Sequence, residues 1–129
     1  MKALLLDTCA ILWWMADAPE LGRAARRAIV NQRNDVIVSA ASLWEIAIKR
    51  RKQRLAGVDE YLARYAELHE QWGFSTVVIE PADAVAAGTL SLPHDDPFDR
   101  MLIVQSRRLR AAIVTCDEAI RQHAPGCVW

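Results

Sequence analysis

A short apolar run, Ala3-Leu4-Leu5-Leu6, stands near the start of the chain and ends on the carboxylate of Asp7. An unbroken apolar run of this length is typical of a strand buried on both faces, as in the middle of a parallel sheet. Ligands of open α/β sheets bind beyond the carboxyl ends of the strands. The run therefore predicts a central strand, with Asp7 at the edge of the sheet where a binding site would form.

Strand-like apolar runs alternate with helical patterns along the rest of the chain. Further strands are expected at 36–38, 76–79 and 112–114, with a short edge strand at 127–129. Helices are expected at 10–16, 19–31, from Ser39 or Ser42 to the basic run before Gly57, 58–72, 81–90, 97–108 and 118–123. Strands that alternate with helices of this length form βα units. The expected fold is an α/β class, three-layer α/β/α sandwich around a central, mostly parallel sheet of four to five strands.

The composition is that of a soluble globular protein. A chain of 129 residues can bury a single core, so one domain over residues 1–129 is expected. Hydrophobic residues make up 53% and charged residues 25%, which argues against a disordered or a membrane protein. No apolar run approaches the ~20 residues of a membrane span, and no signal peptide precedes the first strand. The cytoplasm is therefore the expected location.

The three cysteines, Cys9, Cys116 and Cys127, are odd in number and lack the paired close spacing of a zinc site. A cysteine beside a buried strand end is usually explained by the packing of a small side chain. We therefore expect reduced thiols without a catalytic role.

Four acidic residues are expected at the edge on which the strands end: Asp7, Glu45, Asp99 and Asp117. Each has an ordinary structural explanation. Asp7 and Asp117 follow strands, where an aspartate can cap the next helix and stabilise it by about 1 kcal/mol. Glu45 lies four residues before Lys49, a spacing that favours an ion pair on one helix face. Asp99 falls in the first turn of a helix, where its charge complements the helix dipole.

Three acids compete for one position in the segment Asp95-Asp96-Pro97-Phe98-Asp99. Pro97 suits the first position of a helix, which makes Asp96 the expected N-cap, its oxygen turned onto backbone N–H groups. Asp99 then remains free to project off the helix. The segment therefore predicts that Asp99, and not Asp96, takes part in ion binding.

Taken together, the four carboxylates need a neutralising partner, because like charges gathered on one edge repel one another. Oxygen ligands with little histidine and no thiolate pattern suit Mg²⁺ or Mn²⁺. Such an ion can activate water and stabilise the charge that builds on a phosphodiester. The substrate would then be a nucleic acid. Basic runs, more often a solvated helix face, would here offset the repulsion between acids and phosphates. They comprise Lys49, Arg50, Arg51, Lys52, Arg54, Arg107, Arg108 and Arg110.

Four segments resemble the PIN-domain ribonucleases, and specifically the VapC-type toxins of bacterial type II toxin–antitoxin pairs. They are Leu5-Leu6-Asp7-Thr8, Val38-Ser39-Ala40-Ala41-Ser42-Leu43-Trp44-Glu45-Ile46, Leu92-Pro93-His94-Asp95-Asp96-Pro97-Phe98-Asp99-Arg100 and Val114-Thr115-Cys116-Asp117. The match runs in order over nearly the whole chain, and the third segment is the most specific. The resemblance implies a PIN-like fold and a metal-dependent endoribonuclease that cleaves RNA.

The resemblance also implies roles for single residues. The acidic quartet of the family falls on Asp7, Glu45, Asp99 and Asp117, with the Thr115 hydroxyl beside the last acid. Asp7 and Asp99 are expected to hold the metal, Mg²⁺ or Mn²⁺. Glu45 and Asp117 are expected to complete the charge around it and to orient the attacking water. A homodimer and inhibition by a small cognate antitoxin are implied as well.

Two other functions remain open. A metal-dependent phosphatase acting on small phosphate esters would also carry acids at strand ends. Against it, Asp7 is followed by Thr8-Cys9 and not by a second acid two residues on, as an aspartyl-nucleophile phosphatase would have. The other alternative is a binding module whose acids hold a structural ion. Metal-dependent cleavage of RNA distinguishes the three.

Three tryptophans, Trp13, Trp14 and Trp44, offer more apolar surface than one core face needs. Tryptophans of this kind either close the core of the protein or anchor an interface with another chain. The second interpretation agrees with the dimer and the partner that the resemblance implies.

Overall fold

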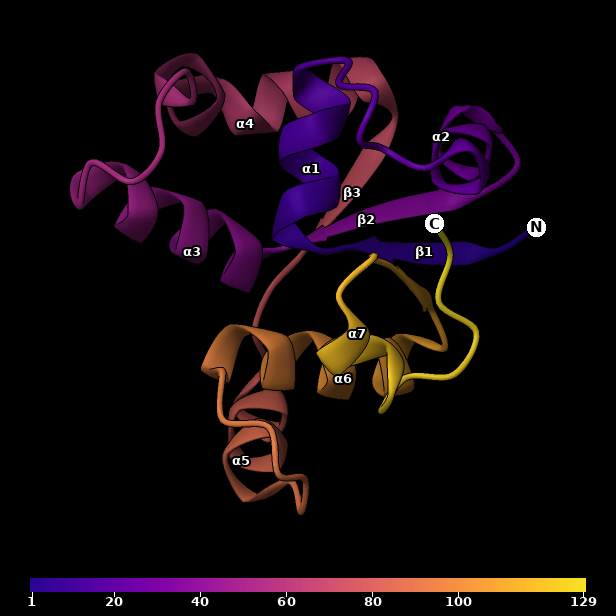
Figure 1. The fold of residues 1–129 in the computed structure, drawn as a ribbon, viewed down its shortest axis with the longest axis vertical. Coiled ribbons are helices and arrows are strands. Elements are labelled where there is room, and N and C mark those ends of the chain that lie inside the picture. The colour runs from indigo at the N-terminus through magenta and orange to yellow at the C-terminus, as the bar shows by residue number, and fades with distance from the viewer.

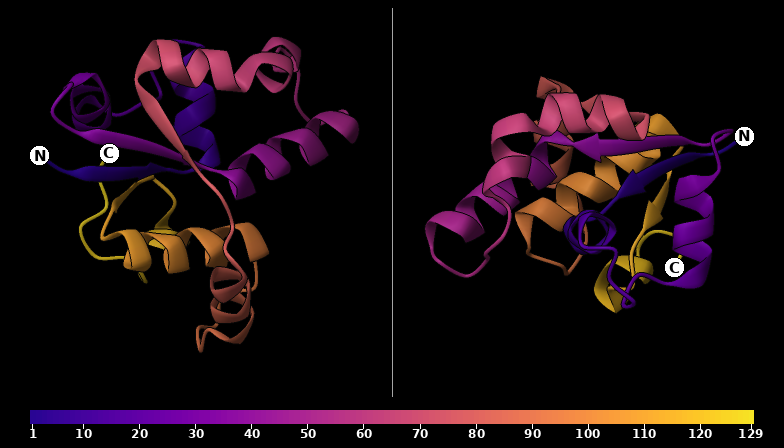
Figure 2. Two further views of the ribbon diagram at one scale, coloured as in Figure 1. Left: turned by 180° about the vertical axis from the view of Figure 1, so that it is seen from behind. Right: turned by 90° about the horizontal axis from the view of Figure 1, so that it is seen from above.

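The computed structural model describes residues 1–129. Its strands are β1 (Ala3–Leu6), β2 (Asp35–Ser39), β3 (Phe74–Val77) and β4 (Ala112–Val114). Its helices are α1 (Thr8–Met15), α2 (Arg23–Val30), α3 (Ala40–Arg51), α4 (Asp59–Trp72), α5 (Pro81–Thr89), α6 (Pro97–Leu109) and α7 (Glu118–Arg121). Helices α1, α2 and α4 cover one face of the sheet, and α6 and α7 cover the other (Figures 1 and 2). The predicted three-layer α/β/α fold is confirmed.

The four strands form one parallel sheet in the order β3-β2-β1-β4. Strand β1 is central, with Leu5 in register with Ile37 on one side and with Ile113 on the other. Its side chains alternate between two cores, because successive residues of a strand point to opposite faces. Leu4 and Leu6 pack in the core beneath α1, α2 and α4, whereas Leu5 packs in the core beneath α6 and α7. The apolar run thus forms the strand that the sequence predicts.

Several elements differ from the sequence-based prediction: α1 begins at Thr8 and not at Ala10, α7 ends at Arg121 and not at His123, and three further differences have a visible cause or consequence. Strand β3 begins two residues early, because Gly73 ends α4 in the left-handed conformation and Phe74 enters the sheet at once. Helix α2 begins at Arg23 and not at Pro19, and the C-terminal Trp129 packs directly against its N-cap, Gly22. The expected edge strand at 127–129 is reduced to a single bridge between Val128 and Val114.

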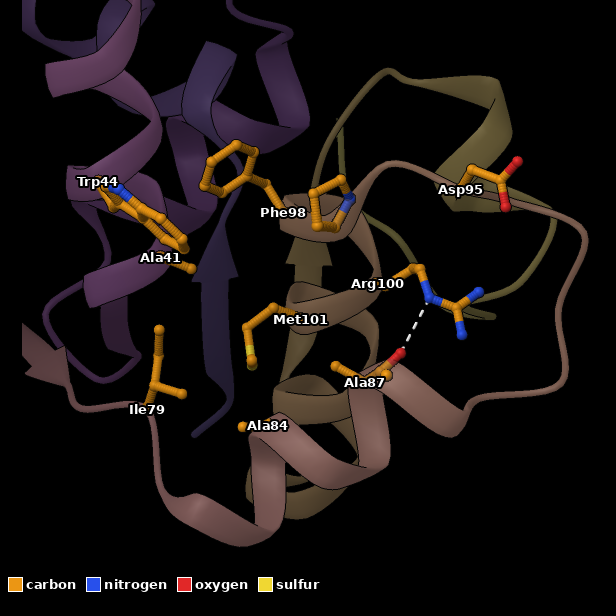
Figure 3. Close-up of a pocket in the computed structure, with 11 residues that line it drawn as sticks. Ala41, Trp44, Ile79, Ala84, Ala87, Asp95, Phe98, Arg100 and Met101 are labelled. Carbon is orange, nitrogen blue, oxygen red and sulfur yellow. Dashed lines mark hydrogen bonds between the residues drawn. The ribbon is translucent and has the colours of Figure 1, made fainter.

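The three tryptophans divide between the two expected environments. Trp13 packs edge-on against Trp129, with ring centroids 5.4 Å apart, and Trp14 packs against Phe74 at 5.8 Å. Both therefore help to close the core. Trp44 is 60% exposed and lies at the rim of a cavity of about 330 Å³ between α3, α5 and α6 (Figure 3).

All three cysteines are free. Cys9 is exposed, yet partial loss of solvation and then the charge of Asp7 raise the pKa of its thiol to about 11, so this group is protonated at neutral pH. A protonated thiol is a poor nucleophile. No helix of this structure is both long enough and apolar enough to cross a membrane.

A buried histidine joins α4 to the sheet. His69 is 2% exposed, and its ring nitrogens form hydrogen bonds of 2.7 Å with the Tyr61 hydroxyl and with the Thr76 hydroxyl. Burial lowers the pKa of His69 because the charged imidazolium is poorly solvated there. The folded protein therefore binds the proton that charges the His69 imidazole more weakly than the unfolded chain does.

This pKa shift predicts that acid destabilises the fold. The stabilisation is complete above the unfolded pKa of a histidine, about 6.5, and is lost as the pH falls from there toward the lower folded pKa. Between about pH 7.5 and about pH 5.5 the His69 shift lowers the denaturant midpoint, whereas Asp99, whose pKa burial raises to about 6, titrates in the same window with the opposite effect. The variant His69→Gln is expected to cost about 1–2 kcal/mol at the higher pH, and its stability is expected to fall less toward acid than that of the wild type, because only the His69 contribution is removed. Profiles of equal slope in both proteins would refute this assignment.

Candidate active site

The candidate site lies where the strand order changes direction. From β1 the chain proceeds to β2 and β3 on one side of the sheet and then crosses to β4 on the other side of β1. Such a switch point leaves a crevice beyond the carboxyl ends of the two strands. The Asp7 backbone N–H donates to the Val114 carbonyl at 3.1 Å, which fixes these two strand ends beside each other. Asp7 and Thr115 are the first residues beyond them.

Asp7 is a buried carboxylate without a cationic partner. It caps α1 by accepting a hydrogen bond from the Ala10 backbone N–H at 2.8 Å, so its expected structural role is present. Only 6% of the residue is exposed, and it takes part in no ion pair. Burial raises its pKa, and the charges of Asp117 and Glu45 raise it further, against a lowering by hydrogen bonds that include one with the Thr115 side chain. The charged form of Asp7 therefore lowers the stability of the metal-free fold.

Asp99 lies in the first turn of α6, as predicted, and is mostly buried. Asp96 is the cap of this helix, because its Oδ1 accepts hydrogen bonds from the backbone N–H groups of Phe98 and Asp99 at 2.9 and 3.1 Å. Burial raises the pKa of Asp99 to about 6, although a hydrogen bond of 2.8 Å from His94 Nε2 to its Oδ2 acts in the opposite direction. The Oδ1 atom of Asp99 has no partner within the chain.

Glu45 faces the site from α3. Ser39 begins this helix by accepting a hydrogen bond from the Ala41 backbone N–H at 3.0 Å. Glu45 Oε2 lies 3.4 Å from Lys49 Nζ, which is the helical ion pair that the spacing indicates. Its Oε1 accepts a hydrogen bond from the Thr8 hydroxyl. Glu45 therefore also ties α3 to the start of α1, directly beside Asp7.

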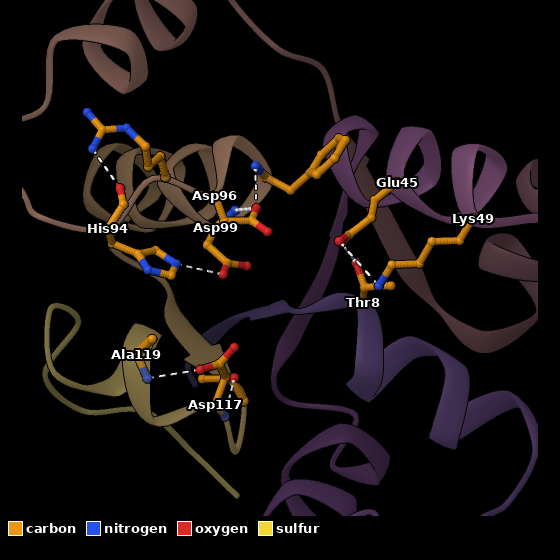
Figure 4. A network of polar contacts seen from close by, with 11 residues as sticks. Thr8, Glu45, Lys49, His94, Asp96, Asp99, Asp117 and Ala119 are labelled. Carbon is orange, nitrogen blue, oxygen red and sulfur yellow. Dashed lines mark hydrogen bonds and ion pairs between the residues drawn. The ribbon is translucent and has the colours of Figure 1, made fainter. Parts of the chain in front are cut away.

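Thr115 links the remaining two acids. Its side chain is fully buried, its hydroxyl oxygen accepts a hydrogen bond from the Asp117 backbone N–H at 3.0 Å, and it lies close enough to Asp7 to lower the pKa of that carboxyl. Asp117 is exposed and caps α7 through Oδ1, which accepts from the Ala119 backbone N–H at 2.9 Å. Its Oδ2 has no partner within the chain. Figure 4 shows the carboxylates of Asp99 and Asp117 pointing toward the same space, with that of Glu45 reaching in from α3.

The residues at this edge fit a hard divalent cation held by few protein ligands. The donor atoms are carboxylate oxygens, Asp7 lacks a cationic partner, and Asp99 and Asp117 each keep a free oxygen. No three acidic, histidine or cysteine side chains are arranged as a ready cage for an ion. A magnesium site does not require such a cage, because Mg²⁺ usually keeps several waters and binds one or two carboxylates together with substrate phosphates.

Three contacts at the site were not predicted from the sequence. Thr8 donates to Glu45, and His94 donates to Asp99, although both residues lie in segments that carry the family resemblance. Arg100 donates to four backbone carbonyls, that of Ala87 in α5 and three in the segment between α5 and α6, which holds the loop before Asp99 in place. In each case the sequence shows only a polar residue within five positions of an acid. Without the fold, this proximity does not identify the group that the polar residue contacts.

Residues 4–124 match the PIN domain family. The chain belongs to the PIN-domain family. This PIN domain is 31% identical to Ribonuclease VapC22 of Mycobacterium tuberculosis (strain ATCC 25618 / H37Rv), over the full length of both chains. Its fold is similar to a crystal structure of VapBC2 from Rickettsia felis bound to a DNA fragment from their promoter. That match has a TM-score of 0.67 and 11% identity, and covers 98% of this chain and 96% of the other. The predicted resemblance to VapC-type PIN domains is confirmed.

Proposed function

We propose that this PIN domain is a metal-dependent endoribonuclease that acts as the toxin of a type II toxin–antitoxin pair. The observation that carries the proposal is the buried, cation-free carboxylate of Asp7 beyond the end of β1, with the acids of Glu45 and Asp117 close enough to raise its pKa. The full-length similarity to Ribonuclease VapC22 supports RNA as the substrate. A cytoplasmic location agrees with this substrate.

In the proposed mechanism Asp7 and Asp99 hold Mg²⁺ or Mn²⁺, and Glu45 and Asp117 complete the charge around it. The bound ion supplies activation of water and stabilisation of charge on the phosphodiester. Asp117, exposed and with a free Oδ2, is available to orient the attacking water. Thr115 would stabilise the charged form of Asp7, because its hydroxyl lowers the pKa of that carboxyl, and it accepts a hydrogen bond from the Asp117 backbone N–H. Thr8 and Lys49 fix Glu45 so that its carboxylate faces the same space.

RNA cleavage by the protein is expected to require a divalent cation. The assay incubates structured RNA with the protein in EDTA and then restores Mg²⁺ or Mn²⁺, with a small phosphate ester tested in parallel. We expect no cleavage in EDTA and recovery with the ion, and a higher unfolding temperature in the presence of the ion. Hydrolysis of the ester without cleavage of RNA would instead favour a phosphatase. Stabilisation by the ion without either activity would favour a binding module.

The proposal includes two protein partners. One is a small antitoxin encoded beside this chain, which the similarity to the VapBC2 structure supports. The other is a second copy of the chain in a homodimer, which is implied by family resemblance. Trp13 and Trp14 lend the dimer no support, since both pack in the core. Light scattering of the protein alone, and with the product of the adjacent gene, measures both associations.

A further inference from the structure

Trp44 stands apart from the other tryptophans, because it is the only one of the five whose side chain is largely exposed. Tryptophan is highly buried on average, so an exposed indole on a regular helix calls for an explanation. Its ring is not loose: it packs edge-on against Phe98 of α6, with centroids 5.2 Å apart and planes at 78°. The contact holds the indole in one orientation and leaves its remaining surface open.

Trp44 and Phe98 are each the sequence neighbour of a site acid. Trp44 directly precedes Glu45 on α3, and Phe98 directly precedes Asp99 on α6. Both rings line the cavity of about 330 Å³ introduced above, whose other walls are mostly apolar side chains of α3, α5 and α6 (Figure 3). None of the four site acids lines this cavity, but two of its lining residues are the sequence neighbours of Glu45 and Asp99, so it offers an apolar surface beside the proposed active site.

Positive charge is available on the same helix. The last turn of α3 and the residues after it carry Arg51, Lys52 and Arg54, which are exposed and form no ion pair within the chain. Arg100, by contrast, lines the cavity but donates four hydrogen bonds to backbone carbonyls. Helix α3 and the residues just after it thus carry, in order, the exposed Trp44, the site acid Glu45 and a group of unpaired cations.

We propose that Trp44 stacks on an unpaired base of the RNA substrate next to the scissile phosphate, while Arg51, Lys52 and Arg54 bind the backbone phosphates that follow. The assignment rests on the proposed function and adds to it how the substrate is held. Proteins bind single-stranded nucleic acid in this way, by combining aromatic stacking surfaces with cations that follow the backbone. A second copy of the chain is the less favoured occupant. A two-fold contact through this face would bring two cation-rich helices together.

Binding is measured in an Asp7→Asn background, so that the RNA stays intact. The probe is a fluorescein-labelled single-stranded RNA of about twelve nucleotides in Mg²⁺, read by fluorescence anisotropy. We expect Trp44→Ala to weaken binding about tenfold or more, as for other stacking residues, and Trp44→Phe to retain most of the affinity. The matched control is Val30→Ala, which trims an exposed apolar side chain at the far end of α2 and leaves the affinity unchanged.

A base-by-base test then locates the stacked nucleotide. Abasic substitutions are moved along the RNA one position at a time. At one position, the abasic substitution is expected to weaken binding to the protein with Trp44 by about the same factor as Trp44→Ala does. In the Trp44→Ala variant, the same abasic substitution is expected to have little further effect. The proposal would be overturned if, at every position, the loss of affinity from the abasic substitution simply added to the loss from Trp44→Ala. The stacking proposal would also be overturned if Trp44→Ala left the RNA affinity unchanged and converted dimers to monomers in light scattering. That result would favour an interface between two copies of the chain.

The outcome is distinguishable from failure of the proposed function. If the wild-type protein cleaves RNA but Trp44→Ala binds as tightly as the parent, the nuclease assignment stands and the stacking assignment falls. If the wild-type protein cleaves no RNA and its Asp7→Asn form does not bind the oligonucleotide, both fall. In the cleavage assay itself, Trp44→Ala is expected to raise KM about tenfold with a smaller effect on kcat, because stacking is present before and during the reaction.

Discussion

Replacing Asp7 with asparagine is expected to slow RNA cleavage by about 10³-fold, equivalent to ~4 kcal/mol of lost transition-state stabilisation. The amide has the size of the carboxylate but lacks the charge that holds a divalent cation. It keeps an oxygen that can accept from the Ala10 backbone N–H, and asparagine is as good a helix cap as aspartate. Loss of activity is therefore not expected to come from loss of the fold.

The same substitution is expected to stabilise the metal-free protein. Burial and the nearby carboxylates disfavour the charged form of Asp7, so removing the charge relieves a cost of folding. Thermal unfolding in EDTA should therefore give a higher Tm for Asp7→Asn than for the wild type. Asp35→Asn, at the opposite end of the sheet, is the matched control and should leave the activity unchanged. Full activity in Asp7→Asn would exclude this residue as a metal ligand.

Asp99 and Asp96, three residues apart, are expected to give opposite results. Asp99→Asn should slow metal-dependent cleavage by about 10³-fold. Little effect on stability is expected, because relief from burying the charge offsets the weakened hydrogen bond from His94, and Asp99 caps nothing. Asp96→Ala should cost about 1 kcal/mol through the two lost capping hydrogen bonds and keep much of the activity.

Thermal denaturation and RNA cleavage, measured on both variants, decide between the two aspartates. Asp96→Asn serves as a control for Asp96→Ala, because asparagine restores the cap without the charge. The reverse pattern, an inactive Asp96 variant and an active but less stable Asp99 variant, would assign the ion to Asp96 and leave Asp99 as a partner of the helix dipole.

Local patterns were sufficient to predict much of this fold. The run that ends at Leu6 could form only a central strand, and Pro97 with Asp96 fixed the start of α6 from chemistry within three residues. What the sequence could not predict depends on contacts between distant residues. Trp129 packs on Gly22 at the start of α2, and no local pattern near α2 predicts this contact with a residue more than a hundred positions away.

The candidate site shows the same division. Asp7, Asp99 and Asp117 could be picked out because each stands at a predictable boundary between elements, whereas Glu45 lies inside α3 and was picked out as the acid on the helix that follows β2. The assignment of the four acids as a metal site remains a prediction. The partners that orient them come from elsewhere in the chain: the Thr8 hydroxyl reaches Glu45 over 37 positions of sequence. Short-range chemistry thus predicts which groups are present, whereas the packing of the layers decides which of them touch.

The position of β1 in the sheet bears on how the protein is made. Strand β1 is synthesised first, yet one of its two neighbours is β4, the last strand to be synthesised. Chains emerge from the ribosome N-terminus first, and pairings between distant segments form late. Until β4 has emerged, Asp7 lacks the Val114 carbonyl and the Thr115 side chain that fix it, and Asp117 is absent from the site. A nascent chain therefore holds an incomplete set of carboxylates, and the proposed nuclease first becomes competent to cut RNA only after β4 and Asp117 have left the ribosome.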